Sequence, residues 1–280
     1  MREINVEQIT QAVSNLCMDA NMRLSKDVEN ALKTAAEKET SEIGKGVLED
    51  LVLNLDAARD LAVPICQDTG MQIIFIDIGQ EIHLVGGNLE EAINMGVRIG
   101  TKLGHLRCSV VSDPLERINT GDNTPAIIHT KIVDGEKITI TVSPKGFGSE
   151  NMSAIKMFTP SATKDDIVAF VTDCVIKAGS NPCPPVVVGV GIGGNFEYSA
   201  YLSKKALCRS LDIRNPKELY SNLEAEMLEK INQTGIGPQG FGGIVTALAV
   251  NIEASATHIA GLPVAVNMGC HVTRHKSVEI

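Results

Sequence analysis

The stretch Pro64-Ile65-Cys66-Gln67-Asp68-Thr69-Gly70 places a thiol, a carboxamide and a carboxylate on adjacent residues between a proline and a glycine. Such a stretch is poorly suited to a hydrophobic core and well suited to a functional site. Before it, apolar residues recur at helical spacing over 6–20 and from about 26 to 62, with an expected break at Gly44-Lys45-Gly46. After it, 71–78 is rich in Ile and predicts a strand. We therefore expect a loop that connects helices to a strand.

Two later cysteines lie in similarly irregular sequence, Cys183 in Asn181-Pro182-Cys183-Pro184-Pro185 and Cys270 in Gly269-Cys270-His271. Because proline donates no backbone hydrogen bond and forces its predecessor to be extended, helix and strand are both excluded around Cys183. All three cysteines are predicted to lie in loops. Three thiolates can bind zinc with one open position, or an iron–sulfur cluster with one iron that lacks a protein ligand. Their spacing does not choose between these, since the cysteines are far apart and no C-x-x-C pair occurs.

Three of the other cysteines are predicted to be packing residues. Cys17 and Cys174 lie on the apolar stripes of expected helices. Cys108 is a rival ligand, but its Val-rich surroundings indicate a strand and favour packing. Seven cysteines, an odd number at irregular spacing, do not suggest a disulfide framework.

The composition limits the classes of partner. With 280 residues and 44% hydrophobic content, the chain can bury a sizeable core, and we expect one domain over 1–280. A net charge of −9 and the lack of Trp disfavour a nucleic-acid partner. No apolar run approaches the roughly 18 residues that span a bilayer, and the first residues lack the apolar region of a signal peptide, so we expect a cytoplasmic protein without a membrane partner.

Helical and strand patterns alternate along the chain, which predicts an α/β fold with mixed sheets and surrounding helices. Asp134-Gly135, between two strand-like runs, is a hairpin signal and argues against a purely parallel sheet. A polar loop over 112–125 separates the preceding helix from these runs, and its length invites a functional interpretation.

The segment 189–194 satisfies G-x-G-x-x-G between a strand and a helix, so a nucleotide-binding oxidoreductase is one alternative. The pattern calls for an acidic residue at the end of a second strand, and Asp212 falls in a polar turn instead. A tight strand-to-helix turn is the better interpretation. A zinc-binding interaction module without catalysis is a further alternative.

His258 is the histidine singled out as a candidate catalytic residue. It lies in a stretch of small residues shortly before Cys270, and an imidazole titrates in the range that suits proton transfer. A lone histidine is more often structural. His83, His105 and His129 have no comparable surroundings, while the roles of His271 and His275, near the end of the sequence, are left open.

Taken together, five motifs resemble the class I, iron–sulfur fumarate hydratases and their L-tartrate dehydratase relatives. The resemblance covers nearly the whole chain. The motifs are 66–70, Leu106-Arg107 with 119–125, Lys145-Gly146-Phe147-Gly148-Ser149-Glu150-Asn151, 181–185 and Gly269-Cys270.

The resemblance implies a set of site residues. Cys66, Cys183 and Cys270 are expected to hold a [4Fe-4S] cluster whose fourth iron is free to bind substrate. The residues expected to contact the substrate are Gln67, Asp68, Arg107 and the glycine-rich segment at Gly148, and His258 is expected in the active site.

The resemblance also implies a partner. Single-chain members continue into a C-terminal domain that supplies further site residues, and this chain stops before it. We expect the α subunit of a two-subunit enzyme that needs a β subunit, assembled as α2β2 or similarly. The expected reaction is the reversible hydration of fumarate to L-malate, with L-tartrate dehydration as the alternative.

The implied chemistry fits these residues. Dehydrating a 2-hydroxy dicarboxylate removes a weakly acidic C–H proton and expels a poor leaving group, which an open iron activates as a Lewis acid. Arg107 can offer a bidentate fork to one carboxylate. A single arginine for two carboxylates suggests that a partner completes the site. Asp68 is expected to orient the proton-transfer group, while the base itself is expected from the β subunit.

Overall fold

The computed structural model describes residues 1–280, which form two compact units. Unit 1 comprises Met1–Ser25, Leu55–Phe147 and Arg274–Ile280, and unit 2 comprises Lys26–Asn54 and Gly148–Thr273. Each unit contains a four-stranded mixed sheet with helices packed on it, so the predicted α/β class with mixed sheets is confirmed. The single domain over 1–280 stays a prediction. No helix is both long and apolar enough to cross a bilayer.

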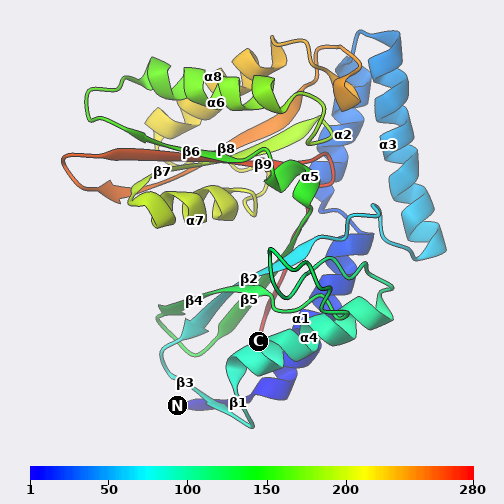
Figure 1. Cartoon of the computed structure of the whole chain (residues 1–280), viewed down its shortest axis with the longest axis vertical. Coiled ribbons are helices and arrows are strands. Elements are labelled where there is room, and N and C mark those ends of the chain that lie inside the picture. Colours follow the sequence, from blue (N-terminus) through cyan, green and yellow to red (C-terminus); the bar gives the residue numbers. More distant parts are fainter. The chain divides into compact units, whose positions relative to one another are not determined.

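Unit 1 is built on a sheet of strand order β10-β5-β2-β4. Its elements are β1 (Arg2–Asn5), α1 (Val6–Met22), β2 (Met71–Gly79), β3 (Ile82–Val85), α4 (Leu89–Leu103), β4 (Ile127–Val133), β5 (Ile138–Lys145) and β10 (Lys276–Glu279). Strand β2 pairs parallel with β4 and antiparallel with β5. Helices α1 and α4 pack together on one face of this sheet, where Ile74 and Ile76 are fully buried (Figure 1).

Close packing of α1 against α4 explains two glycines in α4. A Cβ atom on Gly96 would lie 2.6 Å from the carbonyl oxygen of Thr10, and one on Gly100 would lie 2.8 Å from that of Ser14. Both distances are too short for any side chain. The two backbones therefore approach more closely than two alanine-bearing faces would allow.

The Asp134-Gly135 turn does not form the predicted hairpin. Strands β4 and β5 both pair with β2, which lies between them in the sheet. The turn crosses the end of β2, where Gly79 N donates to the Lys137 carbonyl at 2.8 Å and Gln80 N donates to the Val133 carbonyl at 2.8 Å. The sheet is mixed because β5 runs antiparallel to β2, not because adjacent strands form a hairpin.

Unit 2 is built on a sheet of strand order β6-β9-β7-β8. Its elements are α2 (Lys26–Lys38), β6 (Ala154–Phe158), α6 (Lys164–Ala178), β7 (Val186–Gly194), α7 (Phe196–Ala206), α8 (Glu218–Asn232), η1 (Pro238–Gly240), β8 (Ala247–Thr257) and β9 (Leu262–Gly269). Two further helices, α3 (Glu42–Leu61) and the short α5 (Phe147–Glu150), include residues of both units. Helices α6 and α8 cover one face of the sheet and α7 covers the other (Figure 1).

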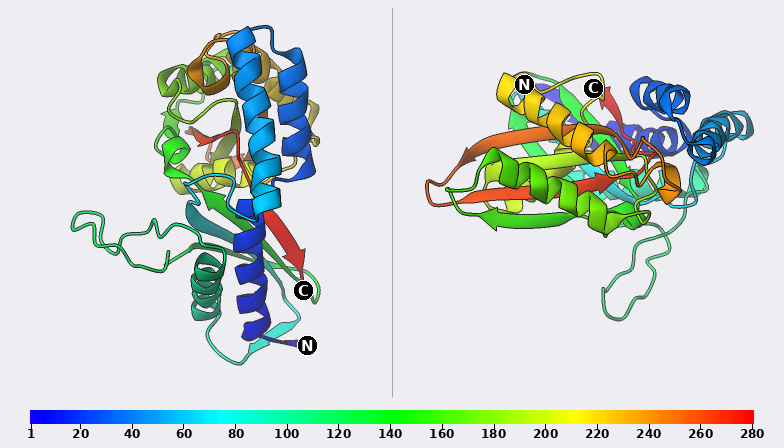
Figure 2. Two further views of the ribbon diagram at one scale, coloured as in Figure 1. Left: turned by 90° about the vertical axis from the view of Figure 1, so that its right-hand side faces the viewer. Right: turned by 90° about the horizontal axis from the view of Figure 1, so that it is seen from above.

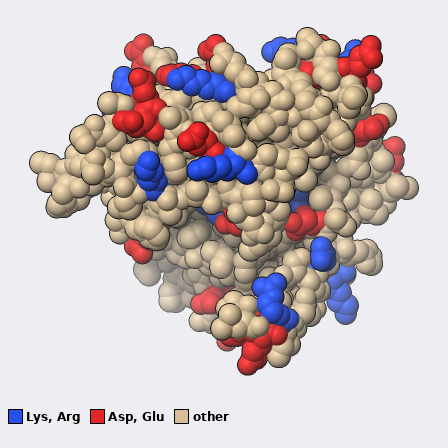
Figure 3. All heavy atoms as spheres, turned by 45° about the horizontal axis from the view of Figure 1, so that its top comes forward, with Lys and Arg blue, Asp and Glu red and all other residues tan.

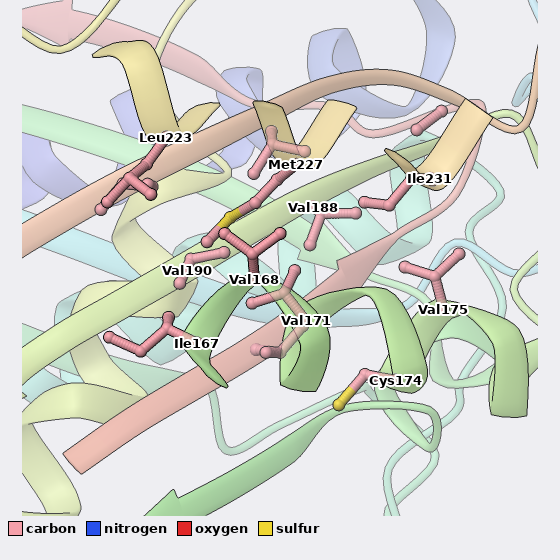
Figure 4. Packing of buried hydrophobic residues seen from close by; sticks show 14 of the residues in the cluster. Ile167, Val168, Val171, Cys174, Val175, Val188, Val190, Leu223, Met227 and Ile231 are labelled. Carbon is pink, nitrogen blue, oxygen red and sulfur yellow. The ribbon is translucent and has the colours of Figure 1, made fainter. Parts of the chain in front are cut away.

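Alternation along β7 divides its side chains between these two faces. Val188 and Val190 point toward α6 and α8, where they meet Val171 and Met227 in a fully buried cluster (Figure 4). Burying one such side chain stabilises the fold by about 1.5–3 kcal/mol. Cys174 belongs to this cluster, which confirms that it is a packing residue.

The intervening residues of β7 are glycines that face α7. A Cβ atom on Gly189 would clash with the carbonyl oxygen of Ser203, and one on Gly191 would clash with that of Ser199. The strand then runs directly into α7, whose N-cap Asn195 accepts a hydrogen bond from Tyr198 N at 2.9 Å. The glycine pattern thus reflects close helix packing and a tight strand-to-helix connection, as the preferred interpretation predicted.

The break between α2 and α3 lies before the two glycines that were expected to cause it. Gly44 and Gly46 are both inside α3, and the break is at 39–41. There the buried Glu39 carboxylate accepts hydrogen bonds from Thr40 N and Ser41 N at 2.8 and 3.0 Å. The next helix then starts after Ser41, whose Oγ atom accepts from Gly44 N at 3.2 Å, and an N-cap serine is a stronger start signal than a glycine inside the helix.

Charged side chains of both signs are interspersed on the face shown in Figure 3. Exposed ion pairs such as Lys33–Glu29, at 2.7 Å, are typical of such a surface. Each contributes about 0–1 kcal/mol, so the two buried cores carry most of the stability.

We predict that Gly191→Ala lowers the free energy of unfolding by about 1–3 kcal/mol or more, because α7 must move away from β7 to accommodate the methyl group. Gly46→Ala is the matched control, since nothing lies within 4 Å of a Cβ there and α3 should gain about 0.5–1 kcal/mol. Urea unfolding of the two variants measures both changes. Equal stability of the two variants would contradict the packing account.

Candidate functional site

In unit 1 the predicted site residues gather at one end of the sheet. Strand β2 begins at Met71 and β5 ends at Lys145, and these two residues are paired in the antiparallel register. Because β4 runs parallel to β2, it begins at the same end, and so the long loop that precedes it arrives there (Figure 2). We call this end of the sheet the Asp68 edge.

Hydrogen bonds fix the Asp68 side chain at this edge. Its Oδ1 atom accepts from Gly70 N at 3.1 Å, and its Oδ2 atom accepts from Phe147 N at 2.9 Å. The Asp68 backbone N–H in turn points at the Cys66 sulfur, 3.4 Å away. The carboxylate thus ties the cysteine loop to the glycine-rich segment that follows β5.

The loop before β4 is attached to the same place. Arg107 N donates to Thr69 Oγ1 at 2.8 Å, and the fully buried Asn123 donates from its Nδ2 atom to the Gly70 carbonyl at 3.0 Å. Cys108 lies in this loop and not in the predicted strand, with its thiol 3.2 Å from the Gly121 carbonyl. The long polar loop therefore supports the cysteine loop directly.

Two side chains at the Asp68 edge are exposed and have no partner within the chain. They are the carboxamide of Gln67 and the guanidinium of Arg107. The Gln67 carboxamide can both donate and accept hydrogen bonds, and the Arg107 guanidinium is permanently positive. They are suited to bind a small anionic molecule.

Arg274 is a supporting residue that the sequence analysis missed. Its guanidinium is buried, with Nε 3.1 Å from Asn21 Oδ1 and an Nη atom 2.5 Å from the Asp68 carbonyl oxygen. In the sequence it stands among polar residues near the end of the chain, where an arginine usually predicts a surface position. No local pattern distinguishes it, because its partners are distant in the sequence.

In unit 2 a second group of predicted residues gathers at one end of the other sheet. Strand β7 begins at Val186 and β9 ends at Gly269, which pairs with Val187. The loops that carry Cys183 and Cys270 therefore leave the sheet at the same end. Strand β6 begins there too, so the segment that starts at Gly148 reaches the same end, which we call the Cys183 edge.

A half-buried ion pair holds the glycine-rich segment at the Cys183 edge. Lys204, on α7, contacts both carboxylate oxygens of Glu150 at 2.5 Å, and Asn267 Nδ2 donates to Glu150 at 3.1 Å. Burial lowers the pKa of Lys204, although the Glu150 carboxylate opposes that shift. Sequence reasoning missed Lys204, because on a surface-like helix it resembles any solvated lysine.

The three candidate cysteines lie outside helices and strands, as predicted. Cys183 is exposed, and Cys66 and Cys270 are half-buried. By contrast, burial raises the pKa of the Cys17 thiol to about 12 and that of the Cys174 thiol to about 11. The three candidates, like Cys108 and Cys208, combine access to solvent with irregular backbone, which Cys17 and Cys174 do not. The structure contains no group of three or more His, Cys, Asp or Glu side chains arranged to hold a metal ion.

His258 lies far from the Cys183 edge within unit 2. It follows β8, whose Thr257 pairs with Gly194 at the end of β7, whereas Cys270 follows Gly269 near the start of β7. The length of β9, at about 3.3 Å per residue, separates the two ends of the sheet. Its closeness to Cys270 in the sequence is thus not closeness in space.

Comparison with known proteins shows the family of this chain. Residues 10–279 match the family model described as fumarate hydratase (Fumerase). The chain belongs to the fumarate hydratase family. The resemblance noted from the sequence is confirmed, and the chain is an enzyme of the hydro-lyase class. This assignment replaces the nucleotide-binding and zinc-module alternatives.

Curated relatives match nearly the whole chain. A protein of Methanocaldococcus jannaschii, provisionally named L(+)-tartrate dehydratase subunit alpha, is 43% identical over 273 residues, which are 95% of each chain. L(+)-tartrate dehydratase subunit alpha of Escherichia coli K12 is 34% identical over 279 residues, which are 98% of this chain and 91% of the relative. The protein of that name from E. coli UTI89 is 33% identical over the same length.

A pH-dependent contact supports the Asp68 edge next to Asn123. Burial alone would raise the pKa of Asp122, but hydrogen bonds from Thr124 and Arg98 outweigh it and lower the pKa to about 2. The folded-state pKa of Asp122 lies below the unfolded value of about 3.9. Its ionised carboxylate therefore stabilises the fold fully at pH values above about 3.9, and this stabilisation is lost as the pH falls toward 2.

We therefore predict that Asp122→Asn is less stable than the unmodified chain at pH 7, by about 1 kcal/mol or less because both partners are partly exposed. The difference should shrink as the pH falls from about 5 to about 3. Urea midpoints across this range provide the measurement. A difference that stays constant with pH would contradict the assignment.

Proposed function

We propose that this chain is the α subunit of a [4Fe-4S]-dependent hydro-lyase that adds water to, or removes it from, a C4 dicarboxylate. The observation that carries the proposal is the gathering of the family's motifs at one end of each sheet. The Asp68 edge has Cys66, Gln67 and Arg107, and the Cys183 edge has Cys183, Cys270 and the segment from Gly148.

The loop thiols fit an iron–sulfur cluster. Cys66, Cys183 and Cys270 have the access that Cys17 and Cys174 lack, and three thiolates leave one iron without a protein ligand. The Asp68 N–H donates to the Cys66 sulfur at 3.4 Å and so helps to fix the direction of that side chain. When bound, the cluster would supply a Lewis-acidic iron for the oxygens of the substrate.

The exposed side chains at the Asp68 edge fit a dicarboxylate. The Arg107 guanidinium can bind one carboxylate through two parallel hydrogen bonds, and Gln67 can donate to a hydroxyl or carboxylate oxygen. Gly148, the first residue of its segment in unit 2, is exposed as well, and its contact with the substrate stays a prediction. These groups bind and orient the substrate.

Asp68 is proposed to orient the proton-transfer group, because both of its oxygens are held by backbone N–H donors and its direction is fixed. Asp68→Asn should lower turnover by about 100-fold or more with the iron content intact, since the amide would lose the charge and one acceptor. Steady-state turnover per cluster is the measurement. Near-normal turnover would reject this role.

A β subunit is proposed to complete the site. The relatives are named as alpha subunits, which implies a partner for those proteins. Arg107 is one cation for a substrate with two carboxylates, so a further cation and the catalytic base are assigned to the β chain. We propose an α2β2 or similar assembly.

The substrate is proposed to be fumarate, hydrated to L-malate, which is supported by the description of the matching family model as fumarate hydratase. L(+)-tartrate is the second candidate, and the names of the relatives favour it. The experiment is an anaerobic assay of the chain co-expressed with its β subunit. We predict hydration of fumarate at a kcat/KM at least about tenfold above that for dehydration of L(+)-tartrate.

The reverse order of the two kcat/KM values would assign tartrate as the substrate and reject fumarate. Loss of activity when the β subunit is omitted is the matched control for the partner. Activity on neither dicarboxylate, with a full cluster and both subunits present, would reject the proposed reaction.

His258 is proposed to act in the site of a neighbouring copy. The resemblance assigns it to the active site, yet it lies at the opposite end of its own sheet from Cys183 and Cys270. Its turn is exposed, with Ile259 90% accessible, as a contact between copies in the oligomer requires. A histidine supplied from a second α chain satisfies both observations.

Mixing two inactive variants tests this assignment. His258→Ala and Cys183→Ser enzymes should each be inactive, and co-assembly should restore up to about a quarter of normal activity through mixed oligomers, in which one site is intact. Activity of the mixture no higher than that of either variant would contradict a role in trans.

A further inference from the structure

Gln239 makes an unusual pair of contacts with the residue that follows Cys183. It lies in η1, half-buried, with a positive φ of 51°. Its backbone N donates to the Pro184 carbonyl at 2.8 Å, and its side-chain Nε2 donates to the same oxygen at 2.6 Å. One residue thus supplies two donors to the carbonyl next to a candidate ligand.

His271 contacts the carbonyl of Cys183, the residue before Pro184. Its backbone N donates to the Cys183 carbonyl at 3.3 Å, and its Nδ1 atom lies 3.1 Å from that oxygen. The same Nδ1 atom lies 3.3 Å from Gln239 Nε2. The residue after Cys270 therefore meets both Cys183 and Gln239, and the three segments form one hydrogen-bonded group.

The backbone held by these contacts is in an unfavourable conformation. Cys183 has a φ of 55°, in the left-handed region that residues with a side chain seldom adopt. Such a conformation persists when surrounding contacts determine it, and it occurs more often at functional sites. The outcome here is that the Cys183 thiol is exposed.

The loop that carries Gln239 is itself firmly supported. The buried Glu39 carboxylate accepts from Ile244 N and Val245 N, each at 3.0 Å. At the other end, Gly237 N donates to the fully buried Thr246 Oγ1 at 3.1 Å. These contacts fix the backbone on both sides of Gln239, which a residue that supports a binding site requires.

We propose that Gln239 is a positioning residue for Cys183, which it holds in the ligand conformation before any metal arrives. The proposal rests on the proposed function, because it takes Cys183 to be a cluster ligand. Side chains that orient metal ligands from behind strongly affect how long the metal is retained. Gln239 has this relationship to Cys183 through the Pro184 carbonyl and His271.

The first test measures amide hydrogen exchange in the reduced, cluster-free αβ complex. Gln239→Ala should speed exchange of the Cys183 and His271 amides by about fivefold, because one side-chain hydrogen bond is lost. Gln233→Ala is the matched control, since Gln233 is exposed on unit 2 and bonds only to Glu229, at 3.2 Å. Equal exchange in both variants and the unmodified chain would overturn the proposal.

The second test separates positioning from general stability. Iron release to a chelator, measured without oxygen on the loaded complex, should be about tenfold faster for Gln239→Ala and unchanged for Gln233→Ala, at an unchanged Tm. A lower Tm with unchanged iron release per folded chain would show a merely structural role and overturn the proposal. If the unmodified complex holds no iron, the proposed function fails, while the exchange result still decides whether Gln239 holds Cys183.

Discussion

The antiparallel pairing of β7 with β9 is the constraint on which the arrangement of the cysteines depends. Because Val187 pairs with Gly269, the loop that ends in β7 and the loop that begins after β9 must meet at one end of the sheet. Two thiols separated by 87 residues (270 − 183) are thereby brought to a common edge. The glycines of β7 allow α7 to lie close against the strand, and α7 carries the lysine that holds Glu150. Core packing and the site thus share the same strand.

The same logic operates in unit 1 through β2 and β5. Their pairing delivers the cysteine loop and the glycine-rich segment to one end, and the parallel strand β4 brings a third loop to it. Polar side chains then join the loops: the Asp68 carboxylate, the buried Asn123 amide and the buried Arg274 guanidinium all bind backbone groups. Each contact satisfies a donor or acceptor that burial would otherwise leave unpaired. The exposed groups that remain, Gln67 and Arg107, are those available to a ligand.

The sequence pattern predicted those elements whose structure depends on residues close together in the chain. The first helix, the strand after Gly70 and the irregular backbone of the three cysteines follow from periodicity and from proline and glycine. The sheet order did not follow, because the Asp134-Gly135 turn has the composition of a hairpin while β2 occupies the place between its strands. Glu39, Lys204 and Arg274 could not be singled out, since their partners are distant in sequence. His258 is close to Cys270 in the sequence but follows the opposite end of the sheet, so its predicted place in the active site stays a prediction.

The central proposal is that Cys66, Cys183 and Cys270 together bind one [4Fe-4S] cluster. The most direct measurement is the iron and acid-labile sulfide content of the αβ complex purified without oxygen, for the unmodified chain and for Ser variants of each cysteine. The account predicts about four of each per α chain, lost in all three variants and retained in Cys108→Ser. A full complement in any of the three variants, or none in the unmodified complex, would contradict it.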